Sequence, residues 1–293
     1  MFTKQHLTWE YAIFSAHIHR YLPYWKWEDH VIIYNKWKAY HQPKPLKYLI
    51  EWDVSALDAL YNGNPKIICL YHLGMHGQIP LVLADHGIHF DLLMDTKVFQ
   101  KNGHEMQVMQ DRLRKTGRYY RFLMSDDPKV LLKARSTIRE GRHLVLFADG
   151  NSGARDSLDR KVQINFLEST IYARKGIALL SYLLQAPVIP VSHYQYENHC
   201  DLFTGMPLLK KENESKEDYI KRCMQFLYEF LGDQIRTHAW HWECWSYLHE
   251  LNCYELPLSK PDHNGLESDG NIDLMLGNKR GVFNRKHFCY LLE

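Results

Sequence analysis

The sequence predicts an α/β fold in which helices flank a mainly parallel or mixed central sheet. Short apolar runs of strand length occur at residues 67–70, 144–148 and 186–191. Segments with apolar residues at helical spacing separate these runs, as at 129–140 and 172–184. A regular alternation of strand and helix is typical of a sheet covered by helices. No internal repeat or low-complexity tract interrupts the pattern.

The composition indicates a globular protein with a substantial core. The chain has 293 residues, of which 45% are hydrophobic, and 36 basic residues are scattered among 34 acidic ones. This balance gives no nucleic-acid signature, so no nucleic-acid partner is expected. Six widely spaced cysteines without a C-x-x-C pair, and no signal peptide, predict reduced thiols in a cytoplasmic protein. Charged residues break the aromatic N-terminal stretch, so it is not expected to span a membrane.

The first part of the chain is expected to be helical. Apolar spacing predicts helices over 8–22 and 25–40, and prolines follow the second one. A third helix is expected over 46–61, ended by the turn Asn62-Gly63-Asn64-Pro65. The apolar strand at 67–70 comes next.

The rest of the chain alternates between strands and helices. After a helix that ends near Asp85, the expected strands are 90–94, 119–124, 144–148, 162–166 and 186–191, with 193–198 as a continuation or a new edge. The expected helices are 97–115, 129–140, 172–184 and 216–236. Residues 257–282 are rich in Pro, Asn, Gly and Asp and predict a loose tail. We therefore expect a main domain over 1–255, including the N-terminal helices, and a loosely packed extension over 256–293.

Two histidines occupy the turn after the strand at 67–70. The turn reads His72-Leu73-Gly74-Met75-His76-Gly77, and apolar residues then resume. A strand that leads through a glycine-containing turn into a helix is where α/β enzymes commonly place chemistry. The i, i+4 spacing of His72 and His76 could put both imidazoles on one helical face, which is the basis of a metal-dependent hydrolase hypothesis. Gly74 and the strand exit argue against a helix through both, and no metal is expected.

Two further motifs are weak. Ser152 in the stretch Asp149-Gly150-Asn151-Ser152-Gly153 matches the G-x-S-x-G nucleophile elbow in part, because Ala154 stands in place of the second glycine. A glycine-rich turn after a strand is the simpler interpretation. The sequence contains no G-x-G-x-x-G or Walker motif, so nothing indicates a bound nucleotide and no cofactor is expected.

A histidine at this turn could also act as a general base in acyl transfer. A hydroxyl is a poor nucleophile near neutral pH, whereas an imidazole titrates close to that pH and can take the proton as the hydroxyl attacks a thioester. The base needs a partner, normally a carboxylate, that fixes its tautomer and stabilises the imidazolium. His72 suits the role of the base by its position.

Several blocks of sequence, taken in order, carry a family resemblance. They are His72-Leu73-Gly74, Glu140-Gly141-Arg142 with the strand before Asp149-Gly150, Arg160 with 162–166, the stretch from Ala173 to Pro190, and Gln234-Ile235-Arg236 with Trp240-His241-Trp242. Together they resemble the lysophospholipid acyltransferase superfamily, in the branch of the late lauroyl/myristoyl-type acyltransferases of lipid A and the phosphatidylinositol mannoside acyltransferases. That branch carries H-x-G-N-[WF]-[DE], with the first histidine as base and the acidic residue as its partner.

This chain has Gly77 at the acidic position of that motif. Three accounts remain. Asp149, which leaves a neighbouring strand end, could approach His72. His76 could itself be the base or could orient His72, because a neutral imidazole can accept a hydrogen bond from another. The chain could also be a non-catalytic acyl- or lipid-binding protein on the same fold. We expect an active enzyme, because the glycine-containing turn and the block from Asp149 to Arg160 are intact.

The resemblance implies an acyltransferase-like fold and transfer of a fatty acyl group to a hydroxyl or amine. The donor would be an acyl carrier protein or coenzyme A thioester, and the acceptor a lipid or natural-product intermediate. The family's membrane-bound members carry an N-terminal spanning helix. This sequence shows none, so we expect a cytoplasmic enzyme or one bound peripherally at the inner membrane.

The expected site residues fall into two groups. The catalytic group consists of His72, His76 and Asp149. The substrate-binding group consists of Gly74, Gly150, Arg160 and Lys161. Arg160 and Lys161 could hold a phosphate or carboxylate of the substrate by charge-assisted hydrogen bonds.

Overall fold

The structure of the chain, a computed structural model, describes residues 8–42, 51–61, 63–115, 120–150, 160–251 and 269–292. It divides into two compact units. The terminal unit contains Met1–Pro43, Asn165–Tyr172 and Gly232–Glu293, and the sheet unit contains Lys44–Ile164 and Ala173–Leu231. The boundary expected between 255 and 256 lies outside the described residues, so the division into 1–255 and 256–293 stays a prediction.

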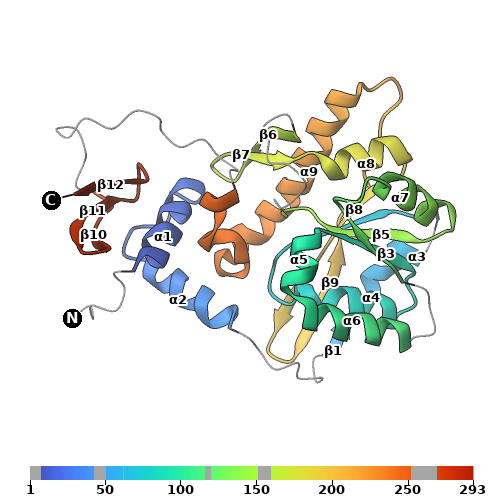
Figure 1. Cartoon of the computed structure of the whole chain (residues 1–293), viewed down its shortest axis with the longest axis horizontal. Coiled ribbons are helices and arrows are strands. Elements are labelled where there is room, and N and C mark those ends of the chain that lie inside the picture. Colours follow the sequence, from blue (N-terminus) through green and yellow to red (C-terminus); the bar gives the residue numbers. More distant parts are fainter. Residues whose placement is uncertain are drawn as a thin grey trace. The chain divides into compact units, whose positions relative to one another are not determined.

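A seven-stranded sheet forms the centre of the sheet unit, which confirms the predicted α/β class (Figure 1). The strand order is β1-β9-β8-β2-β5-β3-β4. Neighbouring strands are parallel except for β8 and β9, which are antiparallel, so the sheet is mixed and mostly parallel as predicted. The strands of this sheet are β1 (Glu51–Asp53), β2 (Ile67–Leu70), β3 (Phe90–Met94), β4 (Phe122–Met124), β5 (His143–Phe147), β8 (Val188–Tyr196) and β9 (His199–Thr204). A separate two-stranded sheet consists of β6 (Lys161–Phe166) and β7 (Ser169–Arg174).

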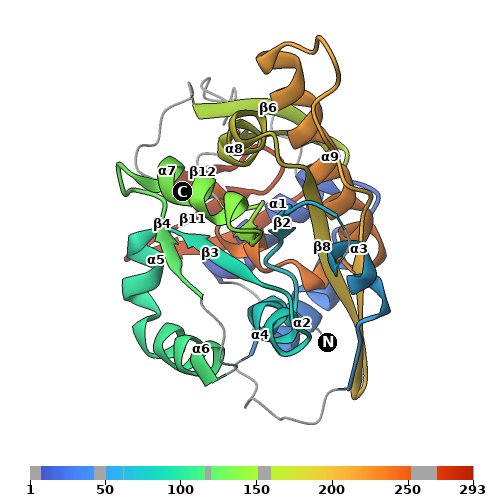
Figure 2. The same cartoon turned by 90° about the vertical axis from the view of Figure 1, so that its right-hand side faces the viewer.

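Helices alternate with these strands along the chain (Figure 2). They are α3 (Asp58–Tyr61), α4 (Ile79–Asp85), α5 (Thr96–Lys101), α6 (Gly103–Lys115), α7 (Val130–Arg139), α8 (Gly176–Leu184) and α9 (Lys216–Thr237), with short 3-10 helices η2 (Ser55–Leu57) and η3 (His76–Gln78). Helix α7 follows Asp127-Pro128 and ends before Gly141, whose φ of +77° favours glycine. The local signals in the sequence therefore bound α7 correctly.

The two faces of the central sheet have different roles. All four residues of β2 are buried, as expected for a parallel strand with both faces covered. On one face, Ile68 and Val145 join a core with residues of α4 and α6. Successive strand residues point to opposite faces, and Leu93 and Leu146 line a cavity together with residues of α7 and α8. The core thus supports the sheet on one side and leaves space on the other.

Three predicted elements differ from the structure. The helix expected over 46–61 is wrong at 51–53, which form β1 and pair in parallel with β9. The helix expected over 97–115 is interrupted at Asn102, between α5 and α6. The helix expected over 172–184 starts at Gly176, because the residues before it belong to β7. In the first and third cases, pairing with another strand overrides the local pattern.

The terminal unit combines helices from the start of the chain with a small sheet from its end. It contains α1 (Trp9–Tyr21), α2 (His30–Tyr40), the 3-10 helices η5 (Ala239–His241), η6 (Glu243–Ser246) and η7 (Leu248–Leu251), and the antiparallel strands β10 (Asn271–Leu276), β11 (Lys279–Asn284) and β12 (Cys289–Leu292). The indole N–H of Trp9 donates to the carbonyl of Met275 at 2.7 Å. The Arg285 guanidinium lies 4.1 Å from the Trp27 ring centroid and donates to Ser15 Oγ at 2.8 Å.

The loose tail expected over 257–282 is wrong for its described part. Residues 271–276 and 279–284 are paired strands, and the glycine between them, Gly277, has a φ of +62°. Gly277 and Asn278 form the turn of this hairpin. Residues 257–268 lie outside the described part of the chain. In the part that the structure does describe, no helix is both long and apolar enough to cross a bilayer.

Candidate active site

The register of the central sheet brings His72 and Asp149 together. Strands β2 and β5 run parallel, with Leu70 opposite Phe147. His72 and Asp149 each lie two residues beyond these positions, at the carboxyl ends of adjacent strands. Asp149 Oδ1 lies 2.8 Å from Nδ1 of His72, and the backbone N–H of His72 donates to Asp149 Oδ2 at 2.9 Å. The approach of Asp149 to His72, one of the three accounts above, is therefore present.

The burial of this pair favours one tautomer of the imidazole. The Asp149 side chain is 0% exposed, whereas that of His72 is 28% exposed. An ionised carboxylate only accepts hydrogen bonds, so Nδ1 of His72 is the donor and Nε2 carries the lone pair. The Phe147 ring, 4.6 Å from the imidazole centroid, packs beside it. The arrangement is that of an oriented base, with Nε2 as the proton-accepting atom.

The turn that carries His72 is held from both neighbouring strands. Gly74 has a φ of +43°, a left-handed conformation that side chains disfavour. The backbone N–H of Met75 donates to Nε2 of His193, on β8, at 2.8 Å. Burial lowers the pKa of His193 to about 4, so its imidazole is neutral at pH 7 and can accept this bond. Asp149 therefore holds the turn from one side and His193 holds it from the other.

His193 is a site-forming residue that the sequence interpretation missed. Core packing or solvent exposure is the expected environment of a histidine outside any motif, and the structure shows His193 buried. The hydrogen bond to Met75 spans 118 positions of the sequence, so no local motif could indicate it.

His76 lies close to His72, but the two do not share a helix. Helix η3 begins at His76, and His72 precedes it. The ring centroids are 5.2 Å apart, edge to face. The helical arrangement behind the metal-site hypothesis is therefore wrong, while the assignment of His76 to the catalytic group stays a prediction. At Gly77, an added Cβ would meet no atom within 4 Å.

An apolar cavity adjoins the His72–Asp149 pair. Its volume is about 650 Å³, and His72, Gly150 and residues of β3, β5, α7 and α8 line it. Three basic residues, Arg160, Arg174 and Lys175, contribute to the same lining. The rest of the wall is largely aliphatic or aromatic, from Leu93, Met94, Val98, Val130, Leu131, Leu146, Phe147, Ala148, Ile177, Leu179, Leu180 and Leu183. The cavity therefore combines a long apolar wall with a cationic part.

The predicted pair of substrate-binding cations is separated in the structure. Arg160 lines the cavity beside His72, whereas Lys161 lines a different cavity of about 240 Å³ with Val162 and Ile220. Lys161 is the first residue of β6, and Arg160 precedes the strand. Arg174 and Lys175 were not predicted. Ser152 lies outside the described residues.

The fold and site define an α/β protein with a histidine–carboxylate pair at the carboxyl edge of a mixed sheet, next to an apolar cavity. No protein-family model matches the sequence, and no curated protein matches it. Among solved structures, the chain is similar to the 1-acyl-sn-glycerophosphate (LPA) acyltransferase PlsC from Thermotoga maritima. The TM-score is 0.39 and the identity 15%, over 77% of this chain and 87% of that one. Similarity at this level assigns neither a family nor an activity.

Proposed function

We propose that this protein is an acyltransferase that moves a fatty acyl group from an acyl thioester to a hydroxyl or amine. The observation that carries the proposal is the His72–Asp149 pair, in which both carboxylate oxygens bind the same histidine beside an apolar cavity. The order of sequence blocks resembling the lysophospholipid acyltransferases supports the same reaction. The acceptor is a lipid or a natural-product intermediate, and the donor is an acyl carrier protein or coenzyme A thioester.

The proposed reaction needs one base and no redox partner. Nε2 of His72 takes the proton of the acceptor as its oxygen or nitrogen attacks the thioester carbonyl. The new bond forms an ester or amide when the tetrahedral intermediate expels the thiolate, which then receives the proton from the imidazolium. Asp149 keeps Nδ1 protonated and stabilises the imidazolium while it carries the proton.

The cavity suits the acyl group by its size and chemistry. A volume of about 650 Å³ lies within the usual range for small-molecule sites. The aliphatic wall favours a hydrocarbon chain, because the transfer of such a chain out of water is favourable. Arg160, Arg174 and Lys175 supply positive charge for a phosphate of the donor or acceptor.

The decisive experiment separates the chemistry of His72 from its structural contact. In His72→Asn, the amide nitrogen occupies the place of Nδ1 and can donate to Asp149, but the side chain has no basic nitrogen. In His72→Ala, a buried carboxylate loses one of its donors, which costs about 1–3 kcal/mol of stability. We expect both variants to lose acyl transfer by about 10²–10⁴-fold, with the stability loss confined to His72→Ala.

The measurement is thiol release and product formation from acyl thioesters, with both carrier-protein and coenzyme A donors. Folding is checked by thermal unfolding. His104→Asn, at an exposed position of α6, serves as the matched histidine control, and His76→Ala tests the other histidine of the predicted catalytic group. Full activity of a folded His72→Asn variant would falsify the assignment of the base.

The cavity also favours a second candidate, a non-catalytic protein that binds acyl chains. Its aliphatic lining and basic residues would bind an acyl thioester whether or not His72 acts on it. Turnover separates the two functions. An acyl thioester that binds without release of thiol, in the presence of a range of hydroxyl and amine acceptors, would support the binding protein.

A further inference from the structure

Helices α7 and α8 expose an unusual combination of leucines and arginines. Leu131, Arg135 and Arg139 follow one another at i, i+4 spacing, so they form one stripe along α7. Leu131 is 37% exposed and the adjacent Leu132 is 65% exposed, while Leu183 on α8 is 41% exposed. We name these five residues the α7–α8 face. Large aliphatic side chains gathered at a surface commonly mark a contact with a membrane or another protein.

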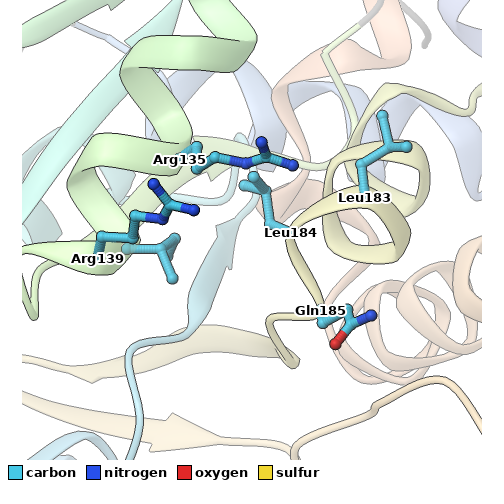
Figure 3. A pocket seen from close by; sticks show the side chains of 6 residues that line it. Arg135, Arg139, Leu183, Leu184 and Gln185 are labelled. Atoms are coloured by element: carbon cyan, nitrogen blue, oxygen red, sulfur yellow. The ribbon is translucent and has the colours of Figure 1, made fainter.

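The two arginines of this face turn toward α8. Figure 3 shows the guanidinium groups of Arg135 and Arg139 directed from α7 toward Leu183 and Leu184. Together with Gln185, these residues line a pocket of about 280 Å³. Gln185 ends α8 in a left-handed conformation, with a φ of 50°.

The same arginines lack an acidic partner within the described part of the chain. Neighbouring cations on this segment are neutralised: Lys133 pairs with Asp127 at 2.5 Å, and Arg142 pairs with the buried Asp91 at 3.1 Å. Arg135 and Arg139 are exposed, and no described carboxylate forms an ion pair with either. The α7–α8 face therefore presents net positive charge.

The α7–α8 face adjoins the apolar cavity beside His72. Leu183 lines both the pocket beside the arginines and the cavity that reaches His72. Leu131 also lines that cavity. An apolar path thus leads from the exposed leucines to the proposed base, with the two arginines at its outer end.

We propose that the α7–α8 face docks on an anionic lipid surface. Guanidinium groups bind phosphate oxygens in a two-pronged geometry, so Arg135 and Arg139 bind lipid headgroups. Leu131, Leu132 and Leu183 enter the acyl region of the lipid layer, and this burial of exposed aliphatic side chains is favourable. An acidic protein would satisfy the arginines, but the apolar path into the cavity matches a hydrocarbon chain. The inference extends the proposed function, because a docked lipid would supply the acceptor or receive the product.

The test is vesicle binding by the full chain, measured by flotation without any turnover. Phosphatidylcholine vesicles containing phosphatidylglycerol are compared with pure phosphatidylcholine vesicles. We expect Arg135→Gln/Arg139→Gln to bind the anionic vesicles about 30-fold more weakly, since each basic residue near such a surface contributes roughly fivefold. Lys221→Gln/Lys279→Gln removes two exposed charges elsewhere and should bind like the wild type.

The apolar contribution has its own pair of variants. Leu132→Asn should weaken vesicle binding, whereas Leu276→Asn, at a comparable 55% exposure on β10, should not. Equal binding to both kinds of vesicle, or unchanged binding of the double arginine variant, would overturn the proposal. So would a double arginine variant that keeps vesicle binding but loses binding to an acidic acyl carrier protein. The vesicle assay needs no activity. Its failure is therefore independent of the His72→Asn experiment, which tests the proposed function.

Discussion

The replacement Asp149→Asn tests the geometry of the proposed base most directly. Both oxygens of the wild-type carboxylate accept from His72, one from Nδ1 at 2.8 Å and one from the backbone N–H at 2.9 Å. An amide keeps the shape but turns one acceptor into a donor. If its NH₂ faced the backbone N–H, two donors would meet in a fully buried position, at a cost of about 1–3 kcal/mol.

The alternative orientation of the amide preserves the fold but deprives His72 of its proton-accepting nitrogen. The amide oxygen then accepts from the backbone N–H, and the NH₂ donates to Nδ1 of His72. The imidazole proton must move to Nε2, so the atom that should accept the acceptor's proton no longer can. We therefore expect a folded variant whose acyl transfer falls by about 10²–10⁴-fold.

Two measurements check this reasoning. Single-turnover thiol release gives the rate, and the ¹⁵N shifts of the His72 ring report which nitrogen is protonated. Asp53→Asn is the matched control, because Asp53 Oδ1 accepts from the backbone N–H of Ser55, a bond that an asparagine oxygen can also accept, and Asp53 is not among the residues that line the cavity. A folded Asp149→Asn variant with the wild-type tautomer and rate would refute the argument.

Two further predictions concern the turn and the pH dependence of stability. Gly74→Ala places a side chain at a φ of +43°, so we expect the free energy of unfolding to fall by about 1–2 kcal/mol and acyl transfer to slow. Gly77→Ala should be neutral, because its Cβ meets no atom within 4 Å. Thermal unfolding and turnover are measured for both variants, and equal behaviour of the two would contradict the role of the turn. Burial lowers the pKa of His193 and of His143 from 6.5 to about 4 each. The unfolded chain takes up these protons near pH 6.5 and the folded chain only near pH 4, so the free energy of unfolding should fall across this window by up to about 3 kcal/mol per histidine. Urea unfolding between pH 7 and pH 4 measures it, and a flat profile would show that these imidazoles are not buried and neutral.

The sequence predicted those elements that are marked by residues within them or next to them. The apolar run of β2 and the proline and glycine around α7 lie within the elements or next to them. Strand β1 was missed because its partner, β9, lies far along the chain. The same holds for the site. His72 was predicted from the strand and turn around it, but the contact of His193 with Met75 depends on which strands are neighbours.

The sheet register places a carboxylate beside His72 although position 77 holds a glycine. Gly77 belongs to η3, where an added Cβ would start in open space. Asp149 is fully buried at the end of a strand whose pairing with β2 is fixed by buried residues. Its position depends on the core, and its two oxygens hold the ring and the backbone of His72 together. A substitution that loosens this core pairing should therefore misplace the proposed base even though it touches neither residue.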